Sequence, residues 1–333
     1  MIYVLLRVGE FDMIPESKSP LPGLVVHADW SMSPKKRWMV MALHQSGLYT
    51  IYAPELVGAL DTFFAGLLGK VQDSQAVLAG FDFPIGLPQA YAELVGVRDF
   101  ITALPGLPDS FFSVAKTHEE ISLERPFYPF RPGGTCRKHL LDGLQLTQVR
   151  QLLRRCELAT PTRNSASPLF WTLGAKQVGR AALCGWKELL IPALKAFGAE
   201  ISVWPFDGNL GSLIATRRLV ITETYPAEGY EHFGFPRSGW SKRAQADRKR
   251  YGKRLLDWAE QRNGAVCLDP LLIEILENGF GPEKDGEDPF DALVGLCSML
   301  EVVLGHRADG APDDPIIRKV EGWILGQPSD WPS

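Results

Sequence analysis

The pattern of apolar and polar positions predicts a sheet at the start of the chain, followed by a helix. Three short apolar segments rich in β-branched residues lie at 24–30, 37–43 and 48–52. Short polar turns join them, so we expect an antiparallel meander. In residues 56–69 leucine and phenylalanine recur every three or four positions, which predicts an amphipathic helix. A fourth apolar segment, 76–82, comes after that helix.

The order of these elements predicts how the later strands run. A helix between two strands makes a crossover connection, so the fourth strand is expected to be parallel to the first. Strand-like sequence returns at 201–205 and 219–225, and an apolar helix is expected from 288 to 304. Asp288 suits the N-cap of that helix, and Pro289 suits its first position.

The sequence changes character between the fourth predicted strand and the next one. Prolines recur throughout residues 96–199, which predicts a large insertion of loops and short helices after strand four. The end of this insertion, 178–197, is apolar on one side and is expected to be a helix that Pro192 kinks or splits. We expect one α/β domain over residues 23–333, with a mixed sheet flanked by helices, and residues 1–22 as an N-terminal appendage.

The composition is typical of a globular protein and excludes several classes. Of the 333 residues, 45% are hydrophobic and 22% are charged. The formal net charge of -4 provides no global basic field, so nucleic-acid binding would require a local patch. No segment approaches the roughly 20 apolar residues of a membrane span, so no membrane association is expected. Five widely spaced cysteines predict reduced thiols in a cytoplasmic protein. The oligomeric state is left open.

Four acidic residues lie at the ends of predicted elements, beside apolar sequence. They are Asp29, Asp82, Glu223 and Asp291. Ligand sites of α/β proteins collect at the carboxyl ends of parallel strands. Carboxylates gathered there repel one another and are costly to desolvate unless a cation lies between them. Two Mg²⁺ or Mn²⁺ ions would remove that cost and would serve in-line phosphoryl displacement.

Each of these residues also has a purely structural interpretation. Asp29 and Asp82 could begin turns, and Glu223 could pair with an arginine. Asp291 could interact favourably with the dipole at the start of its helix. The order of the four residues along the predicted elements favours the functional interpretation.

That order resembles the ribonuclease H-like fold. More narrowly, four short segments resemble the predicted-nuclease family catalogued as domain of unknown function 429. These segments are Gly80-Phe-Asp-Phe-Pro-Ile-Gly-Leu-Pro88, Glu223-Thr-Tyr-Pro-Ala227, Asp288-Pro-Phe-Asp-Ala-Leu293 and Glu321-Gly-Trp-Ile324. The resemblance spans residues 24–325. It implies a central mixed sheet flanked by helices, and it implies that Asp29, Asp82, Glu223 and Asp291 are catalytic metal ligands.

Basic residues of the insertion are candidates for substrate binding. Arginine and lysine side chains contact phosphates through charge-assisted hydrogen bonds, and a solvated, ion-paired surface is the alternative. The candidates are Arg131, Arg137, Lys138, Lys176 and Arg180. The basic run at 240–250 is interpreted as a solvated helix face.

The sequence therefore predicts a metal-dependent nuclease that hydrolyses phosphodiester bonds and whose insertion grips DNA or RNA. Two alternatives remain open. One is an ATP-using phosphotransferase or hydrolase of the actin-like type, although Asp29 is followed by Trp-Ser-Met-Ser-Pro rather than by a glycine-rich phosphate loop. The other is a non-catalytic protein that retains the fold to bind nucleic acid or protein, which the negative net charge favours.

Overall fold

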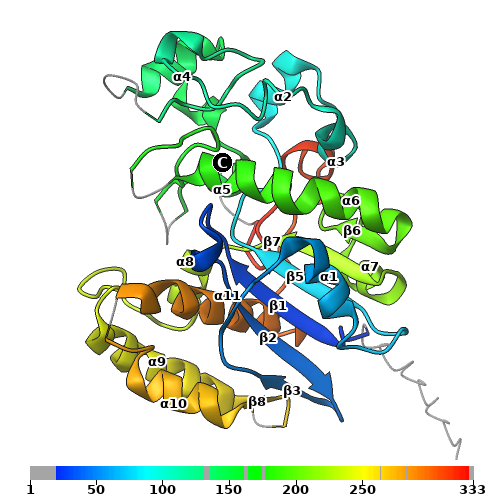
Figure 1. The fold of residues 1–333 in the computed structure, drawn as a ribbon, viewed down its shortest axis with the longest axis vertical. Helices are drawn as coiled ribbons and strands as arrows, with labels where there is room; N and C mark the ends of the chain where they lie inside the picture. Colours follow the sequence, from blue (N-terminus) through cyan, green and yellow to red (C-terminus); the bar gives the residue numbers. More distant parts are fainter. Residues whose placement is uncertain are drawn as a thin grey trace, which may run out of the picture.

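A mixed sheet lies at the centre of the structure, with helices on both of its faces (Figure 1). The structure is a computed structural model that describes residues 20–130, 136–160, 164–174, 177–262, 264–282 and 284–329. Most of the expected appendage at 1–22 lies outside these residues. The predicted mixed α/β architecture is confirmed. None of the described helices is long and apolar enough to cross a membrane.

The described residues form eight strands in one sheet. The strands are β1 (Leu24–Asp29), β2 (Trp38–Gln45), β3 (Leu48–Ile51), β4 (Glu55–Leu56), β5 (Val77–Phe81), β6 (Ile201–Val203), β7 (Leu219–Glu223) and β8 (Val266–Leu268). Their order across the sheet is β6-β7-β5-β1-β2-β3-β8, and β4 pairs with β2. The predicted antiparallel meander is confirmed for β1, β2 and β3. The predicted parallel pairing of β1 with β5 is also confirmed, and β7 is parallel to β5.

Eleven α-helices occur within the described ranges. They are α1 (Leu60–Leu68), α2 (Gln89–Val95), α3 (Phe100–Ala103), α4 (Arg137–Gly143), α5 (Val178–Cys184), α6 (Ile191–Phe197), α7 (Leu210–Thr216), α8 (Pro226–His232), α9 (Gln245–Gln261), α10 (Pro270–Asn278) and α11 (Glu287–Val303). Helix α1 begins later than its apolar pattern predicts, because Glu55–Leu56 pairs with β2 instead. Between α5 and α6 the chain forms a π-helical segment, Gly185–Leu190, directly before α6 and Pro192. Proline cannot donate to a regular helical ladder.

Helix α11 starts at Glu287, two residues before Pro289, the first helical position that was predicted. Gly286 is its N-cap, so the N-cap assignment of Asp288 is wrong. A short 3₁₀ turn, Lys284–Gly286, leads directly into the helix. Asp288 therefore lies inside the first turn, where its carboxylate still interacts favourably with the helix dipole.

Successive residues of β1 face two different apolar layers, because side chains alternate along a strand. Val26 and Ala28 pack in the layer that contains α1 and the insertion. Val25 packs in the layer that contains α11. His27 points to that second layer as well and is fully buried, and its Nδ1 lies 3.0 Å from the carbonyl oxygen of Ala292. Helix α11 thus lies across β1 and β2, with its first turns near the carboxyl end of β1 (Figure 1).

The insertion packs against the sheet through aromatic side chains. Phe83, which follows β5, belongs to the same apolar cluster as Phe127, Phe170 and Trp186 of the insertion. The indole Nε1 of Trp186 donates to the carbonyl oxygen of Pro84 at 2.7 Å. This contact fixes the insertion against the segment that leaves β5, which is the edge of the sheet where the candidate carboxylates lie.

The close approach of α11 to β1 gives a test of the fold. In Gly295→Ala, the added methyl group would overlap the imidazole of His27, so we expect a loss of about 1–3 kcal/mol in the free energy of unfolding. Gly66→Ala is the matched control, because Gly66 lies on the exposed side of α1 with open space around it. That substitution should stabilise the protein by up to about 1 kcal/mol. Urea denaturation measures both, and equal effects would contradict the packing described.

Candidate active site

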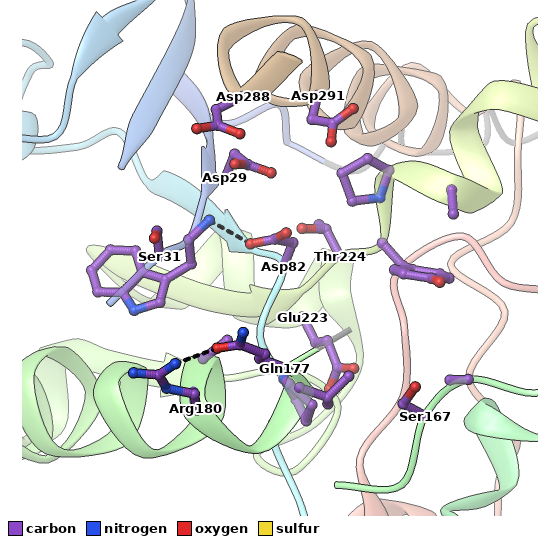
Figure 2. A pocket seen from close by; sticks show the side chains of 18 of the residues that line it. Asp29, Ser31, Asp82, Ser167, Gln177, Arg180, Glu223, Thr224, Asp288 and Asp291 are labelled. Atoms are coloured by element: carbon purple, nitrogen blue, oxygen red, sulfur yellow. Dashed lines mark hydrogen bonds between the residues drawn. The ribbon is translucent and has the colours of Figure 1, made fainter. Parts of the chain in front are cut away.

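The candidate site lies at the edge of the sheet where three parallel strands end. A cavity of about 750 Å³ opens there, lined by residues from the ends of β1, β5 and β7. Asp29 is the last residue of β1, and Asp82 directly follows β5. Helix α11 brings Asp288 and Asp291 to the same cavity (Figure 2). Elements far apart in the sequence thus place four carboxyl groups around one space.

The carboxyl groups at the site perturb one another's pKa values. Burial raises the pKa of Asp29 well above its usual range, and the charges of Asp82, Asp291 and Asp288 raise it further. Burial also raises the pKa of Asp82 to about 7, although a hydrogen bond from the Trp30 amide opposes the shift. That amide nitrogen lies 2.6 Å from Asp82 Oδ1. The charge of Asp82 raises the pKa of Asp29, so the folded protein favours a protonated carboxyl group at this pair.

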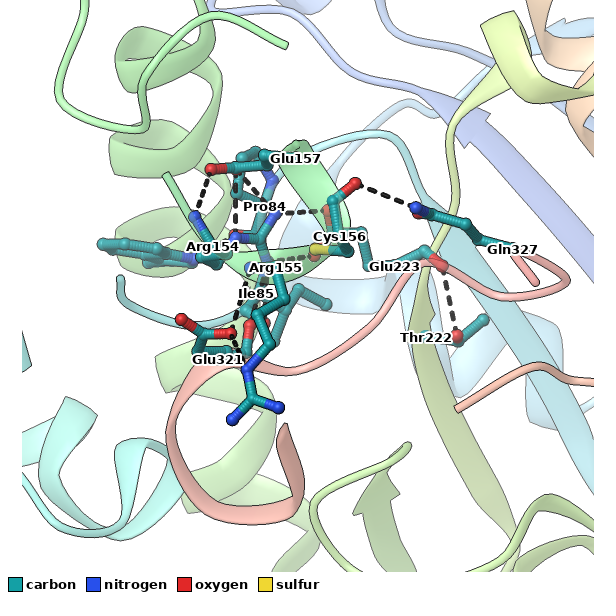
Figure 3. A network of polar contacts seen from close by, with 11 residues as sticks. Pro84, Ile85, Arg154, Arg155, Cys156, Glu157, Thr222, Glu223, Glu321 and Gln327 are labelled. Carbon is teal, nitrogen blue, oxygen red and sulfur yellow. Dashed lines mark hydrogen bonds and ion pairs between the residues drawn. The ribbon is translucent and has the colours of Figure 1, made fainter. Parts of the chain in front are cut away.

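Glu223, the fourth predicted ligand, also lines the cavity, but its carboxylate is bound by an arginine (Figure 3). Its two oxygens accept from Nη2 and Nη1 of Arg154 at 2.6 and 2.7 Å. The amide of Ile85 donates to the same carboxylate at 2.6 Å. Arg154 is fully buried and also pairs with Glu157 at 2.9 Å. The structure therefore brings Asp29, Asp82 and Asp291 together, and it separates the carboxylate of Glu223 from them by an ion pair.

Thr224, the residue after Glu223, is the side chain of this strand end that faces the carboxylates. Side chains alternate along an extended chain, so Thr224 and Glu223 point to opposite sides. Figure 2 shows the hydroxyl of Thr224 directed toward Asp82. Thr224 is only 5% exposed, and its Oγ1 has no hydrogen-bond partner among the described residues. A buried hydroxyl of this kind requires an explanation, such as a ligand that binds it.

Lys242 is a site residue that the sequence interpretation missed. Its Nζ donates to Asp291 Oδ2 and lies 3.2 Å from Glu287 Oε1. The hydroxyl of Tyr230 donates to the other carboxylate oxygen of Asp291. For Lys242 the interpretation of 240–250 as a solvated face is wrong, because the loop before α9 turns this side chain back onto α11. The charge run itself gave no signal for the exception.

Of the five predicted substrate-binding residues, two lie outside the described residues and two lie away from the cavity. Arg131 and Lys176 lie outside the described residues. Arg137 and Lys138 belong to α4, which Figure 1 shows at the far end of the molecule from α11. Lys138 is exposed and pairs with Asp142 at 2.7 Å, as expected for a solvated helix surface.

Arg180 is the remaining candidate, and it does line the cavity. Its Nη1 donates to Gln177 Oε1 at 2.6 Å, and Figure 2 shows it across the cavity from the carboxylates of α11. The guanidinium lies over the ring of Phe130, 4.4 Å from the ring centroid. Lys36 and Arg243 also line the cavity, so basic side chains reach it from the sheet side as well as from the insertion.

The donor chemistry of the site suits a hard divalent cation. Asp29, Asp82 and Asp288 offer only oxygen atoms, which Mg²⁺ and Mn²⁺ prefer. Burial and neighbouring negative charges raise the pKa values of all three, and a cation between them would relieve both effects. In the described part of the chain, no three Asp, Glu, His or Cys side chains already form a metal-binding group. Ion binding would require these carboxyl groups to lose their protons, because a metal ion binds the carboxylate form.

Comparisons of the chain with protein-family models, with curated proteins and with solved structures find no match.

The ion pair of Arg154 predicts a large effect on stability. In Arg154→Met, the carboxylates of Glu223 and Glu157 would be left buried without a counter-charge, so we expect the free energy of unfolding to fall by about 3–5 kcal/mol. Arg125→Met is the control, because the Arg125 side chain is 36% exposed and pairs with the partly exposed Glu120. Its loss should be about 1 kcal/mol or less. Urea denaturation followed by tryptophan fluorescence separates the two, and a small loss for Arg154→Met would contradict a structural role.

The raised pKa of Asp82 predicts a pH-dependent difference in stability. A carboxyl group whose folded pKa exceeds its unfolded value destabilises the folded state progressively as the pH rises through the folded pKa. Asp82→Asn removes this penalty, and its amide oxygen can still accept from Trp30. In EDTA, the melting temperature of the variant relative to the unmodified protein should therefore rise between pH 5 and pH 8, by at least about 2 °C.

Asp109→Asn provides the control for that experiment, because Asp109 is exposed and remote from the cavity lining. Its melting temperature relative to the unmodified protein should not change with pH over the same interval. A pH-independent difference for Asp82→Asn would contradict the carboxyl pair described.

Proposed function

We propose that the protein is a metal-dependent nuclease of ribonuclease H-like fold, which hydrolyses phosphodiester bonds in DNA or RNA. The observation that carries this proposal is the convergence of Asp29, Asp82 and Asp291, with Asp288, at the carboxyl ends of β1 and β5. Charges that raise one another's pKa values in a polar cavity are typical of functional sites. The sheet supports the fold assignment, because an antiparallel meander followed by parallel β5 and β7 agrees with the mixed sheet that the resemblance implies.

In this proposal three of the carboxyl groups bind the metal ion. Asp29, Asp82 and Asp288 would hold Mg²⁺ or Mn²⁺, which supplies charge neutralisation of the phosphate when bound. In hydrolysis a water oxygen forms a bond to phosphorus, the bond to the leaving oxygen breaks, and that oxygen takes up a proton. The attacking water gives up a proton as it forms this bond, and a bound Mg²⁺ or Mn²⁺ ion would lower the pKa of that water.

The insertion contributes the opposite wall of the cavity. Arg180 can donate to phosphate oxygens through charge-assisted hydrogen bonds, and it stands across the cavity from the carboxylates. The ring of Phe130 beneath its guanidinium is 43% exposed, and such a pair offers a flat surface on which an unpaired base can stack. A strand passing through the cavity would thus meet carboxylates on one side and a basic, aromatic side on the other.

Glu223 has a positioning task in this proposal. Its ion pair with Arg154 holds the end of β7 against the insertion, which keeps Thr224 directed at the carboxylates. We therefore assign metal binding to Asp29, Asp82 and Asp288, and not to Glu223.

The proposal is tested by cleavage assays on panels of single-stranded, duplex and branched DNA and RNA, with Mg²⁺ or Mn²⁺ added after EDTA treatment. We expect ion-dependent cleavage that falls at least about 100-fold in Asp29→Asn and in Asp82→Asn. Asp109→Asn should cleave like the unmodified protein. Unchanged cleavage in Asp82→Asn would exclude this mechanism. No cleavage by the unmodified protein, together with a Mg²⁺-dependent rise in melting temperature on adding ATP, would favour the phosphotransferase class instead.

A further inference from the structure

We propose that Lys242 is a fixed cation of the site, which takes the place of one of two metal ions, so that the cavity binds a single divalent ion. This inference rests on the proposed function and narrows it, because two-metal nucleases hold a pair of ions about 3.5–4 Å apart. One divalent ion would bind, and Lys242 would supply the second positive charge.

The ammonium group of Lys242 lies among the carboxylates of the site. Lys242 Nζ is hydrogen-bonded to Asp291 and lies 3.2 Å from Glu287. Although burial opposes its charged form, Asp291, Glu287 and Asp29 together raise the pKa of Lys242. The ion pairs with Asp291 and Glu287 therefore favour the charged form of the ammonium group.

The backbone of Lys242 is also held in place. The buried guanidinium of Arg248 donates to the carbonyl oxygen of Lys242 at 2.6 Å. The same guanidinium donates to the carbonyl oxygens of Gly279 and Gly281 at 2.9 and 2.8 Å. The loop that carries Lys242 is thus tied to the segment that leads into α11, which is the helix that Lys242 contacts.

Aromatic packing fixes the residues just before Lys242 as well. The ring of Trp240 packs against Tyr230, Phe235 and Tyr251, with centroids 4.9, 5.2 and 5.4 Å away. Its Nε1 donates to the carbonyl oxygen of Pro236 at 2.7 Å. Because the loop is anchored on both sides of Lys242, the ammonium is a built part of the site rather than a mobile surface charge.

Asp291 has no carboxylate oxygen that is free to bind a metal ion. Both carboxylate oxygens of Asp291 are hydrogen-bonded, one to Lys242 and the other to Tyr230. A second ion would have to displace both partners to use Asp291. Lys242 forms its ion pairs with Asp291 and Glu287 rather than with Asp29 or Asp82. The unpaired hydroxyl of Thr224 is directed toward Asp82 (Figure 2), which marks this side of the cavity as the place for a ligand.

A fixed ammonium can supply part of what a second ion would supply. Lysine is a compact point charge on a flexible stem, and a preorganised charge stabilises a phosphate without reorganisation during the reaction. A lysine cannot lower the pKa of a water as a metal ion does, so the single ion remains necessary. The site would then depend on metal concentration as a one-ion site.

The test measures Mn²⁺ bound to the full-length protein, by isothermal titration calorimetry and by electron paramagnetic resonance, without substrate. We expect one ion per chain in the unmodified protein, with the spectrum of isolated Mn²⁺. Lys242→Met removes the charge at similar side-chain length, and we expect it to bind two ions with the spectrum of a coupled pair. Arg243→Met is the matched control, because Arg243 pairs with Glu287 at 3.1 Å but not with Asp291. It should bind one ion.

The number of Mn²⁺ ions bound by each protein distinguishes the possible results. Two ions in the unmodified protein would overturn the inference and leave the proposed nuclease standing. One ion in both the unmodified protein and a folded Lys242→Met would show that Lys242 does not replace an ion. No ion in the unmodified protein would overturn both the inference and the metal-dependent function. If Lys242→Met fails to fold, the count and the spectrum of the unmodified protein still decide between one ion and two.

Discussion

The buried guanidinium of Arg154 is the interaction on which the arrangement of the site depends. It comes from the insertion, and it binds Glu223 at the end of β7 together with the carbonyl oxygens of Ile85 and Glu321 (Figure 3). Glu223 is the last residue of β7, Ile85 lies in the turn after β5, and Glu321 lies in the C-terminal segment. A guanidinium has five donors in a rigid plane, so it can hold several acceptors in one geometry. Arg154 thereby joins the insertion to the sheet at the edge where the cavity opens.

Much of the fold could be predicted from the sequence, because its main strands are apolar, continuous and bounded by turns. The crossover rule then fixed the relative direction of β1 and β5. With two parallel strands side by side, Asp29 and Asp82 had to lie at the same edge. Asp291 was expected near them, because it lies at the start of an apolar helix that must pack on the sheet. What failed were short elements such as β4 and β8, whose two and three residues carry no usable period.

The remaining parts of the site depend on contacts that no local pattern records. Arg248 and Trp240 fix the loop that places Lys242 beside Asp291. Arg248 does so by binding Gly279 and Gly281, which lie more than 30 residues away from it in the sequence. The partner of Glu223 was equally hidden, since Arg154 lies 69 positions earlier in an irregular segment. Thr224 could have been recognised, because the alternation of side chains places it opposite Glu223.

The neighbouring positions of Glu223 and Thr224 make the end of β7 sensitive to register. A strand that slips by a single residue turns every side chain to the opposite side. Inserting or deleting one residue within β7 would therefore exchange the two groups. It would add a further negative charge to the cluster of aspartates, and it would leave Arg154 with a hydroxyl in place of its counter-charge. The length of this strand is thus as strict a requirement as the identity of any residue in it.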